Sequence, residues 1–217
     1  MRFAQHAASA TARGTLEGDA AVDYVVRAAA GQTLEVELDA THRMNDFNVL
    51  APGSKDVAMY SSAMSGVRKY TGVLPADGDY VIRVYIGRAA ARRHEASDFR
   101  LTVTLRGKPL PALPMAHDAR VAGTPYHATA RIRCVPPFAS GAAQCDAGVV
   151  RRGHDGTATV EVRGSADLRR RILFVQGRPT ASDAMDAMTF SRRGDIGVVT
   201  FESGERYEIP DAFLTGG

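Results

Sequence analysis

The chain has 217 residues, of which 45% are hydrophobic, 24% charged and 7% aromatic. This composition is that of a globular protein and excludes disorder as the main state of the chain. No segment approaches the roughly 20 uninterrupted apolar residues of a membrane-spanning helix, which excludes an integral membrane protein. The net charge of +3 comes from 27 basic and 24 acidic residues without a concentrated basic stripe, so no nucleic-acid partner is expected.

The first half of the chain consists of short alternating segments separated by turn signals. In the segment 33–38, Leu34, Val36 and Leu38 share one face, as in a half-buried strand. The pair Asp77-Gly78 predicts a hairpin turn before an apolar strand. Strands are expected at 9–16, 22–28, 33–38, 46–50, 67–74, 80–86 and 99–106. Such a series predicts an all-β fold with an antiparallel β-sandwich over residues 1–107.

The segment 108–124 is rich in proline and predicts a semi-extended linker. The remaining residues, 125–217, are again β-rich and predict a smaller second domain, either a small antiparallel sheet or an open barrel. One helical turn is expected at 182–188, because Ser182 is a favourable N-cap and acidic residues follow it. Strands are expected at 126–133, 147–151, 157–162, 171–175, 197–201 and 206–209.

Two cysteines, Cys134 and Cys145, flank a segment rich in proline and small residues that is typical of a loop between two strands. A disulfide at the neck of this loop is the favoured interpretation, with a stabilisation of about 3 kcal/mol from chain entropy. Two free thiols and a metal site are the alternatives, although two cysteines alone cannot form a structural zinc site. A disulfide indicates an oxidising compartment.

The N-terminus lacks the apolar core of a secretory signal. Either the protein is cytosolic, or the sequence is that of a mature form with an added initiator Met. The strand pattern begins almost at once, which favours a mature periplasmic or secreted protein.

The sequence matches none of the common enzyme templates: it has no Gly-x-Ser-x-Gly, His-Glu-x-x-His, P-loop or Gly-x-Gly-x-x-Gly motif. The short carboxylate pairs offer too few oxygen ligands for a calcium loop. No catalytic residue, metal site or cofactor is therefore expected. The scattered histidines are each expected in exposed loops; they are His6, His42, His94, His117, His127 and His154.

The most informative segment is the loop 87–97, where Arg88 and Arg92 lie four residues apart. On a helical turn both side chains project from one face. Two guanidiniums on one protruding face can bind carboxylates through bidentate hydrogen bonds. The alternative is an internal ion pair, either Arg92 with Glu95 or Arg93 with Asp98. The bias of 24 Arg to three Lys fits such a surface but also fits simple coding bias.

Three stretches of the first half carry a family resemblance. They are 1–18 with Asp23-Tyr24 and Ala30-Gly31-Gln32; 74–85, which reads Leu-Pro-Ala-Asp-Gly-Asp-Tyr-Val-Ile-Arg-Val-Tyr; and 88–93 followed by 98–103. Residues 1 to about 107 thereby resemble the periplasmic inhibitors of goose-type lysozyme.

This resemblance implies a β-sandwich that blocks the active-site cleft of a goose-type lysozyme, with a role in bacterial defence of peptidoglycan. The loop arginines that match the family are Arg88 and Arg92. Arg93 is the third residue expected to contact the partner, although it points elsewhere on a helical turn. A goose-type lysozyme uses a catalytic glutamic acid in a cleft that carries carboxylates. Guanidiniums inserted there would pair with the carboxylates, lower the pKa of the acid and exclude the sugar.

The second half, 125–217, has no counterpart in these single-domain inhibitors. Its basic run Arg169-Arg170-Arg171 is either a solvated strand start or a contact with an anionic cell wall or membrane surface. The alternative function is a non-inhibitory module that binds glycan or a cell-envelope protein, with its specificity in the second half. An enzyme is the third hypothesis and requires a polar cleft that holds a carboxylate pair or a His/acid pair.

Overall fold

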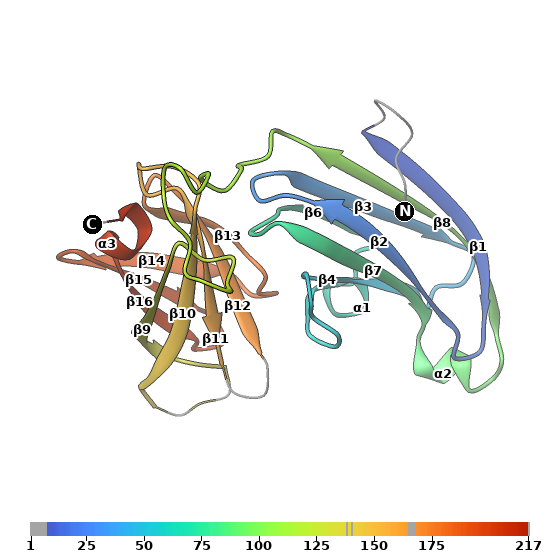
Figure 1. The fold of residues 1–217 in the computed structure, drawn as a ribbon. Coiled ribbons are helices and arrows are strands. Elements are labelled where there is room, and N and C mark those ends of the chain that lie inside the picture. The colour runs from blue at the N-terminus through green and yellow to red at the C-terminus, as the bar shows by residue number, and fades with distance from the viewer. Residues whose placement is uncertain (1–7, 138, 140, 165–167, 217) are drawn as a thin grey trace. The chain divides into compact units, whose positions relative to one another are not determined.

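The computed structural model describes residues 8–137, 139, 141–164 and 168–216 (Figure 1). The stretch 1–7, which contributes to the family resemblance, lies outside the described residues. The chain divides into two compact units, residues 1–109 and 110–217, so the second is only marginally the smaller. No helix within the described part of the chain is long and apolar enough to cross a membrane.

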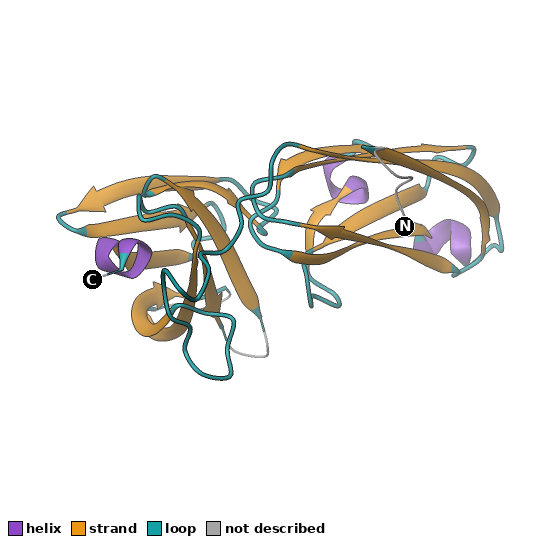
Figure 2. Cartoon of the chain, turned by 45° about the horizontal axis from the view of Figure 1, so that its top comes forward, coloured by secondary structure: helices purple, strands orange, loops and turns teal. Residues whose placement is uncertain are grey.

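Unit 1 is a sandwich of two four-stranded antiparallel sheets, and Figure 2 shows its two layers. The sandwich expected over the first half is confirmed. One sheet has the order β1-β8-β3-β6, with strands Ser9–Glu17, Ala96–Arg106, Thr33–Ala40 and Lys69–Val73. The other has the order β2-β7-β4-β5, with strands Ala21–Ala28, Gly78–Ile86, Asn45–Leu50 and Ala58–Ser61. Two short helices interrupt the strands, α1 (Ser62–Ser65) and α2 (Arg88–Ala91).

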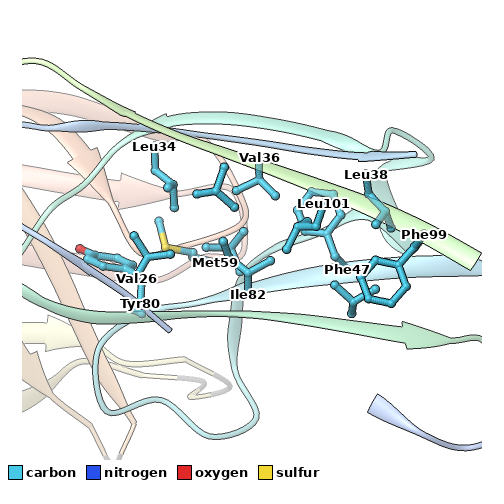
Figure 3. Close-up of a cluster of buried hydrophobic side chains, with 14 of the residues drawn as sticks. Val26, Leu34, Val36, Leu38, Phe47, Met59, Tyr80, Ile82, Phe99 and Leu101 are labelled. Carbon is cyan, nitrogen blue, oxygen red and sulfur yellow. The ribbon is translucent and has the colours of Figure 1, made fainter. Parts of the chain in front are cut away.

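The core of unit 1 lies between the two sheets, where apolar side chains from both layers point toward one another (Figure 3). Leu34 and Leu101 come from one sheet and Ile82 from the other, and all three are fully buried. Burying one such side chain stabilises the fold by about 1.5–3 kcal/mol. Tyr80 is also fully buried, and its hydroxyl donates a 2.8 Å hydrogen bond to the Ala76 carbonyl. The strict alternation of each strand therefore provides a dry core and a polar outer surface.

Unit 2 is a single eight-stranded antiparallel sheet that curls until it is nearly closed. Its order is β13-β12-β11-β10-β9-β16-β15-β14. The strands are β9 (Ala128–Val135), β10 (Ala143–Arg151), β11 (Ala158–Arg163), β12 (Arg169–Val175), β13 (Arg178–Ser182), β14 (Met188–Arg193), β15 (Ile196–Phe201) and β16 (Arg206–Pro210), followed by α3 (Asp211–Thr215). The edge strands β13 and β14 are consecutive in the chain, and residues 183–187 connect them.

The helical turn expected at 182–188 does not form. Ser182 ends β13, and the next five residues are irregular. Asp183 is 5% exposed and accepts hydrogen bonds from the backbone of Arg171 and the side chain of Arg170. Tertiary ion pairs have therefore overridden the local capping signal.

The disulfide between Cys134 and Cys145 is present, as the loop composition predicts, with an S–S distance of 2.04 Å. It joins the neighbouring strands β9 and β10, and both cysteines are buried. The cross-link closes the loop between these strands.

Most of the proline-rich segment belongs to unit 2, and it is hydrogen-bonded to the strands of that unit. The Leu113 N–H donates to the Arg151 carbonyl, and the Leu113 carbonyl lies 3.1 Å from His127 Nε2. His127 is 7% exposed, so the expectation of an exposed loop histidine is wrong at this position. The ring can be buried without cost to its polar atoms, because Nδ1 accepts a hydrogen bond from the Arg151 N–H and Nε2 faces the Leu113 carbonyl.

The run Arg169-Arg170-Arg171 begins β12, but only Arg169 is solvated there, with 48% of its side chain exposed. Arg170 pairs with Glu205 at 2.7 Å and with Asp183 at 3.0 Å, and its side chain is only 11% exposed. Arg171 pairs with Glu161 at 2.9 Å and with Asp183 at 3.2 Å. Burial alone would lower the pKa of Arg170, but the hydrogen bonds that it donates to Glu205 and the charge of Asp183 raise the pKa instead. Both expectations for this run are wrong for Arg170 and Arg171, because three acids from distant segments surround them.

Candidate functional site

The candidate site is the loop between β7 and β8, which carries α2 at one end of the sandwich (Figure 1). Three consecutive alanines favour a helical turn here. Ala90 is fully buried in the core of unit 1, so its side chain anchors the turn to the sandwich. The Gly87 N–H donates to the Met44 carbonyl at 2.7 Å, and the Gly18 N–H donates to the Glu95 carbonyl at 3.3 Å. These bonds fix the loop to the two neighbouring turns.

Arg88 and Arg92 are both exposed and border the same shallow hollow of about 450 Å³, together with Asp19, Ala91 and His94. The spacing of four residues therefore places the two side chains together, as expected for a helical turn. Arg92 Nε lies 3.4 Å from the Arg88 carbonyl. Neither arginine forms an ion pair with any residue that the structure describes. Their guanidiniums are thus exposed to solvent on a fixed loop.

Arg93 has a different environment. Its Nε donates to Glu95 Oε1 at 2.6 Å. The ion pairs considered from the sequence, Arg92 with Glu95 and Arg93 with Asp98, are absent among the described residues. The hydrogen bond from Arg93 lowers the pKa of Glu95 below its usual value of 4.5.

Glu95 also faces His42, at 2.7 Å between His42 Nε2 and Glu95 Oε2. The Met44 N–H donates to His42 Nδ1, so a neutral ring carries its proton on Nε2, toward Glu95. The pair connects the turn before β4 with the arginine loop. Sequence reasoning missed this contact because the two residues are far apart in the chain and no local pattern joins them.

His94 ends the helical turn in a left-handed conformation, with a φ of 53°. A residue in this conformation commonly follows the last turn of a helix and redirects the chain. The His94 N–H donates to the Ala91 carbonyl at 3.0 Å. The loop therefore turns sharply into β8 and leaves Arg88 and Arg92 at its outer surface.

The chemical groups that the site presents to solvent are the two arginine guanidiniums. Among the residues that the structure describes, no group of three or more His, Cys, Asp or Glu side chains could hold a metal ion. What the loop can do is donate hydrogen bonds from two fixed guanidiniums to a partner that carries carboxylates.

No protein-family model matches the chain, and no curated protein matches it significantly. Among solved structures, the chain matches PliG of Aeromonas hydrophila, a periplasmic inhibitor of g-type lysozyme, at 36% identity. That match covers 49% of this chain and 93% of the inhibitor, with a TM-score of 0.46. The N-terminal half of the chain is similar to the periplasmic inhibitors of g-type lysozyme. The family resemblance seen in the sequence is thereby confirmed for about half of the chain.

Two further inhibitors of this kind match over the same share of the chain. PliG of Salmonella Typhimurium is 28% identical, with 95% of its chain covered and a TM-score of 0.38. A PliG mutant from Escherichia coli is 26% identical, with 95% of its chain covered and a TM-score of 0.39. These matches leave about half of the present chain without a counterpart in the inhibitors.

Proposed function

We propose that unit 1 is a proteinaceous inhibitor of a goose-type lysozyme and that Arg88 and Arg92 enter the active-site cleft of that enzyme. The observation that carries the proposal is the pair of exposed guanidiniums on one anchored loop, neither of which forms an ion pair with a described residue. The similarity to periplasmic inhibitors supports an inhibitory role and a periplasmic or secreted location.

The loop has the properties that such a contact requires. Guanidiniums form bidentate hydrogen bonds with carboxylates, and exclusion of water strengthens these bonds. A positive charge beside the catalytic acid of a lysozyme would lower the pKa of that acid and so remove its proton at working pH. Because Ala90 and Gly87 already fix the backbone, little conformational entropy is lost when the loop binds.

Arg93 is assigned a positioning role within this proposal. Its guanidinium is already bound to Glu95, which is in turn close to His42. This chain of contacts orients the loop at its base, whereas Arg88 and Arg92 lie at its outer surface.

The proposal is tested by titrating goose-type, chicken-type and invertebrate-type lysozymes with the full chain in a cell-wall clearing assay. Selective inhibition of the goose-type enzyme at or below micromolar protein is the expected result. Equal inhibition of all three enzymes would contradict the specificity. A lack of inhibition of any of them would overturn the inhibitor function and favour the non-inhibitory binding module.

A further inference from the structure

The outer face of β9, β10 and β11 in unit 2 carries a row of three charged side chains. The register places Asp146 of β10 opposite Arg131 of β9 on one side and Arg163 of β11 on the other. Residues directly opposite one another in an antiparallel sheet point to the same face. Two guanidiniums therefore flank one carboxylate across three neighbouring strands.

This row borders a hollow of about 450 Å³ on the sheet surface. Tyr126 forms the floor of the hollow, with only 6% of the residue exposed. Its ring lies against Gly148, where an added Cβ would approach the ring to 2.5 Å. The glycine therefore allows the ring to lie close to the strands. The Tyr126 hydroxyl donates to Glu161 at 2.7 Å and accepts a hydrogen bond from Arg163 at 3.2 Å, which positions Arg163 at the rim.

The charged groups at the rim retain most of their hydrogen-bonding capacity. The side chains of Arg131 and Asp146 are 71% and 79% exposed, and their closest N–O distance of 3.8 Å exceeds that of a hydrogen bond. The side chain of Arg163 is 54% exposed. Thr129, opposite Gly148 in the register, adds a hydroxyl to the lining.

We propose that this hollow binds an acidic saccharide, a sugar chain that carries carboxylate groups. The two guanidinium forks match carboxylates. Asp146, between them, can accept hydrogen bonds from sugar hydroxyls, which phosphate does not offer. A volume of about 450 Å³ lies within the usual range of ligand sites and is large enough for a short oligosaccharide. The proposal concerns unit 2 and does not rest on lysozyme inhibition by unit 1.

Calorimetric titration of the full chain tests the proposal with three probes: trigalacturonate, its fully methyl-esterified form and inorganic phosphate. Trigalacturonate should bind at least about tenfold more tightly than either of the others, because only it combines carboxylates with hydroxyls. Failure of trigalacturonate to bind, or equally tight binding of phosphate, would overturn the proposal.

Three variants locate the site. Arg131→Gln combined with Arg163→Gln should weaken trigalacturonate binding at least about tenfold, the loss of two charge-assisted contacts. Arg178→Gln is the control, matched in charge to Arg131→Gln alone, because Arg178 is exposed on β13 of the same sheet and outside the hollow. An equal loss in the control would show that overall charge alone drives binding and would refute the site.

Arg131→Gln alone is a second test variant. The hydrogen bonds of the Tyr126 hydroxyl go to Glu161 and Arg163, so the floor of the hollow should keep its conformation in this variant. This single variant should weaken binding by at least about threefold while the thermal unfolding temperature stays unchanged. Unchanged affinity in this variant would contradict the proposed role of the guanidinium pair.

Discussion

The two units of this protein place neighbouring arginines in opposite environments. In unit 1, Arg88 and Arg92 project from an anchored loop beside a hollow that Asp19 also borders, and neither forms an ion pair with a described residue. In unit 2, Arg170 and Arg171 are enclosed by three carboxylates and are nearly inaccessible to solvent. The comparison teaches that the role of an arginine is set by the residues that the fold brings to it, and not by the local run of sequence.

The buried network of unit 2 joins segments that are far apart in the chain. Arg170 belongs to β12, Asp183 begins the connection from β13 to β14, and Glu205 precedes β16. The Arg170 guanidinium also lies over the ring of Phe201, at 5.2 Å from its centroid. Since desolvated charges cost several kcal/mol each unless they are paired, this network is stable only as a whole.

Removing Asp183 is the strongest test of the difference between the buried arginines of unit 2 and the exposed arginines of unit 1. Asp183→Ala removes one of the two carboxylate partners of each buried guanidinium and leaves the backbone N–H of Arg171 without its acceptor. The expected loss is about 3–5 kcal/mol of the unfolding free energy of unit 2, measured by denaturant titration. Inhibition of lysozyme should be unchanged, because the arginine loop belongs to unit 1.

The matched control is Asp39→Ala in unit 1, which breaks an exposed pair with Arg100. Exposed pairs contribute at most about 1 kcal/mol, so this variant should unfold almost as the parent protein does. Similar losses in the two variants would contradict the distinction between buried and exposed ion pairs.

Removal of the disulfide should cause the next largest loss of stability, and this loss should again be confined to unit 2. Replacing both Cys134 and Cys145 by Ser opens a loop with a sequence separation of 11. The chain-entropy model predicts a loss of about 3 kcal/mol. Calorimetry should show one transition that moves to lower temperature and one, from unit 1, that does not. A shift of the transition of unit 1 would show that the two units do not unfold independently.

The contacts at the base of the arginine loop give the smallest effect. Glu95→Gln removes the charge that faces Arg93 and His42, and inhibition should weaken by about two- to fivefold, the range of a partly exposed ion pair. The hydrogen bond from Arg93 lowers the pKa of Glu95, so its stabilising effect is fully present above the usual value of 4.5 and disappears as the pH falls through the lowered pKa.

Glu95 should therefore stay ionised between about pH 7 and about pH 5, and its protonation should not weaken inhibition by the parent protein in this range. The measurement is the inhibition constant at both pH values, with uninhibited lysozyme at each pH as the reference. A loss of inhibition at about pH 5 in the parent but not in Glu95→Gln would contradict this assignment.

Much of the fold was predictable, because alternation is a local signal. The apolar face formed by Leu34, Val36 and Leu38 identified β3 as a strand, and the Asp77-Gly78 turn located the start of β7. The edge strand β5 was missed because its four residues are too few to show a period. The helical turn at 182–188 was wrong because Asp183 bonds to arginines on another strand.

The candidate site was only partly predictable. The spacing of Arg88 and Arg92 predicts that they share one face, and the structure places both at one hollow. Their lack of an acidic partner, and the pairing of Arg93 with Glu95, depend on the rotamers and on neighbouring turns. The hollow above Tyr126 was not predictable, because it arises from three strands brought together by register.

The most direct test of the account is the inhibition of a goose-type lysozyme by the double variant Arg88→Ala/Arg92→Ala. The control is Arg27→Ala, because Arg27 pairs with Asp79 at the opposite end of the sandwich. We predict that the double variant inhibits at least about tenfold less well, with unchanged thermal unfolding, while the control inhibits like the parent. Unchanged inhibition by the double variant would contradict the claim that these two guanidiniums block the cleft.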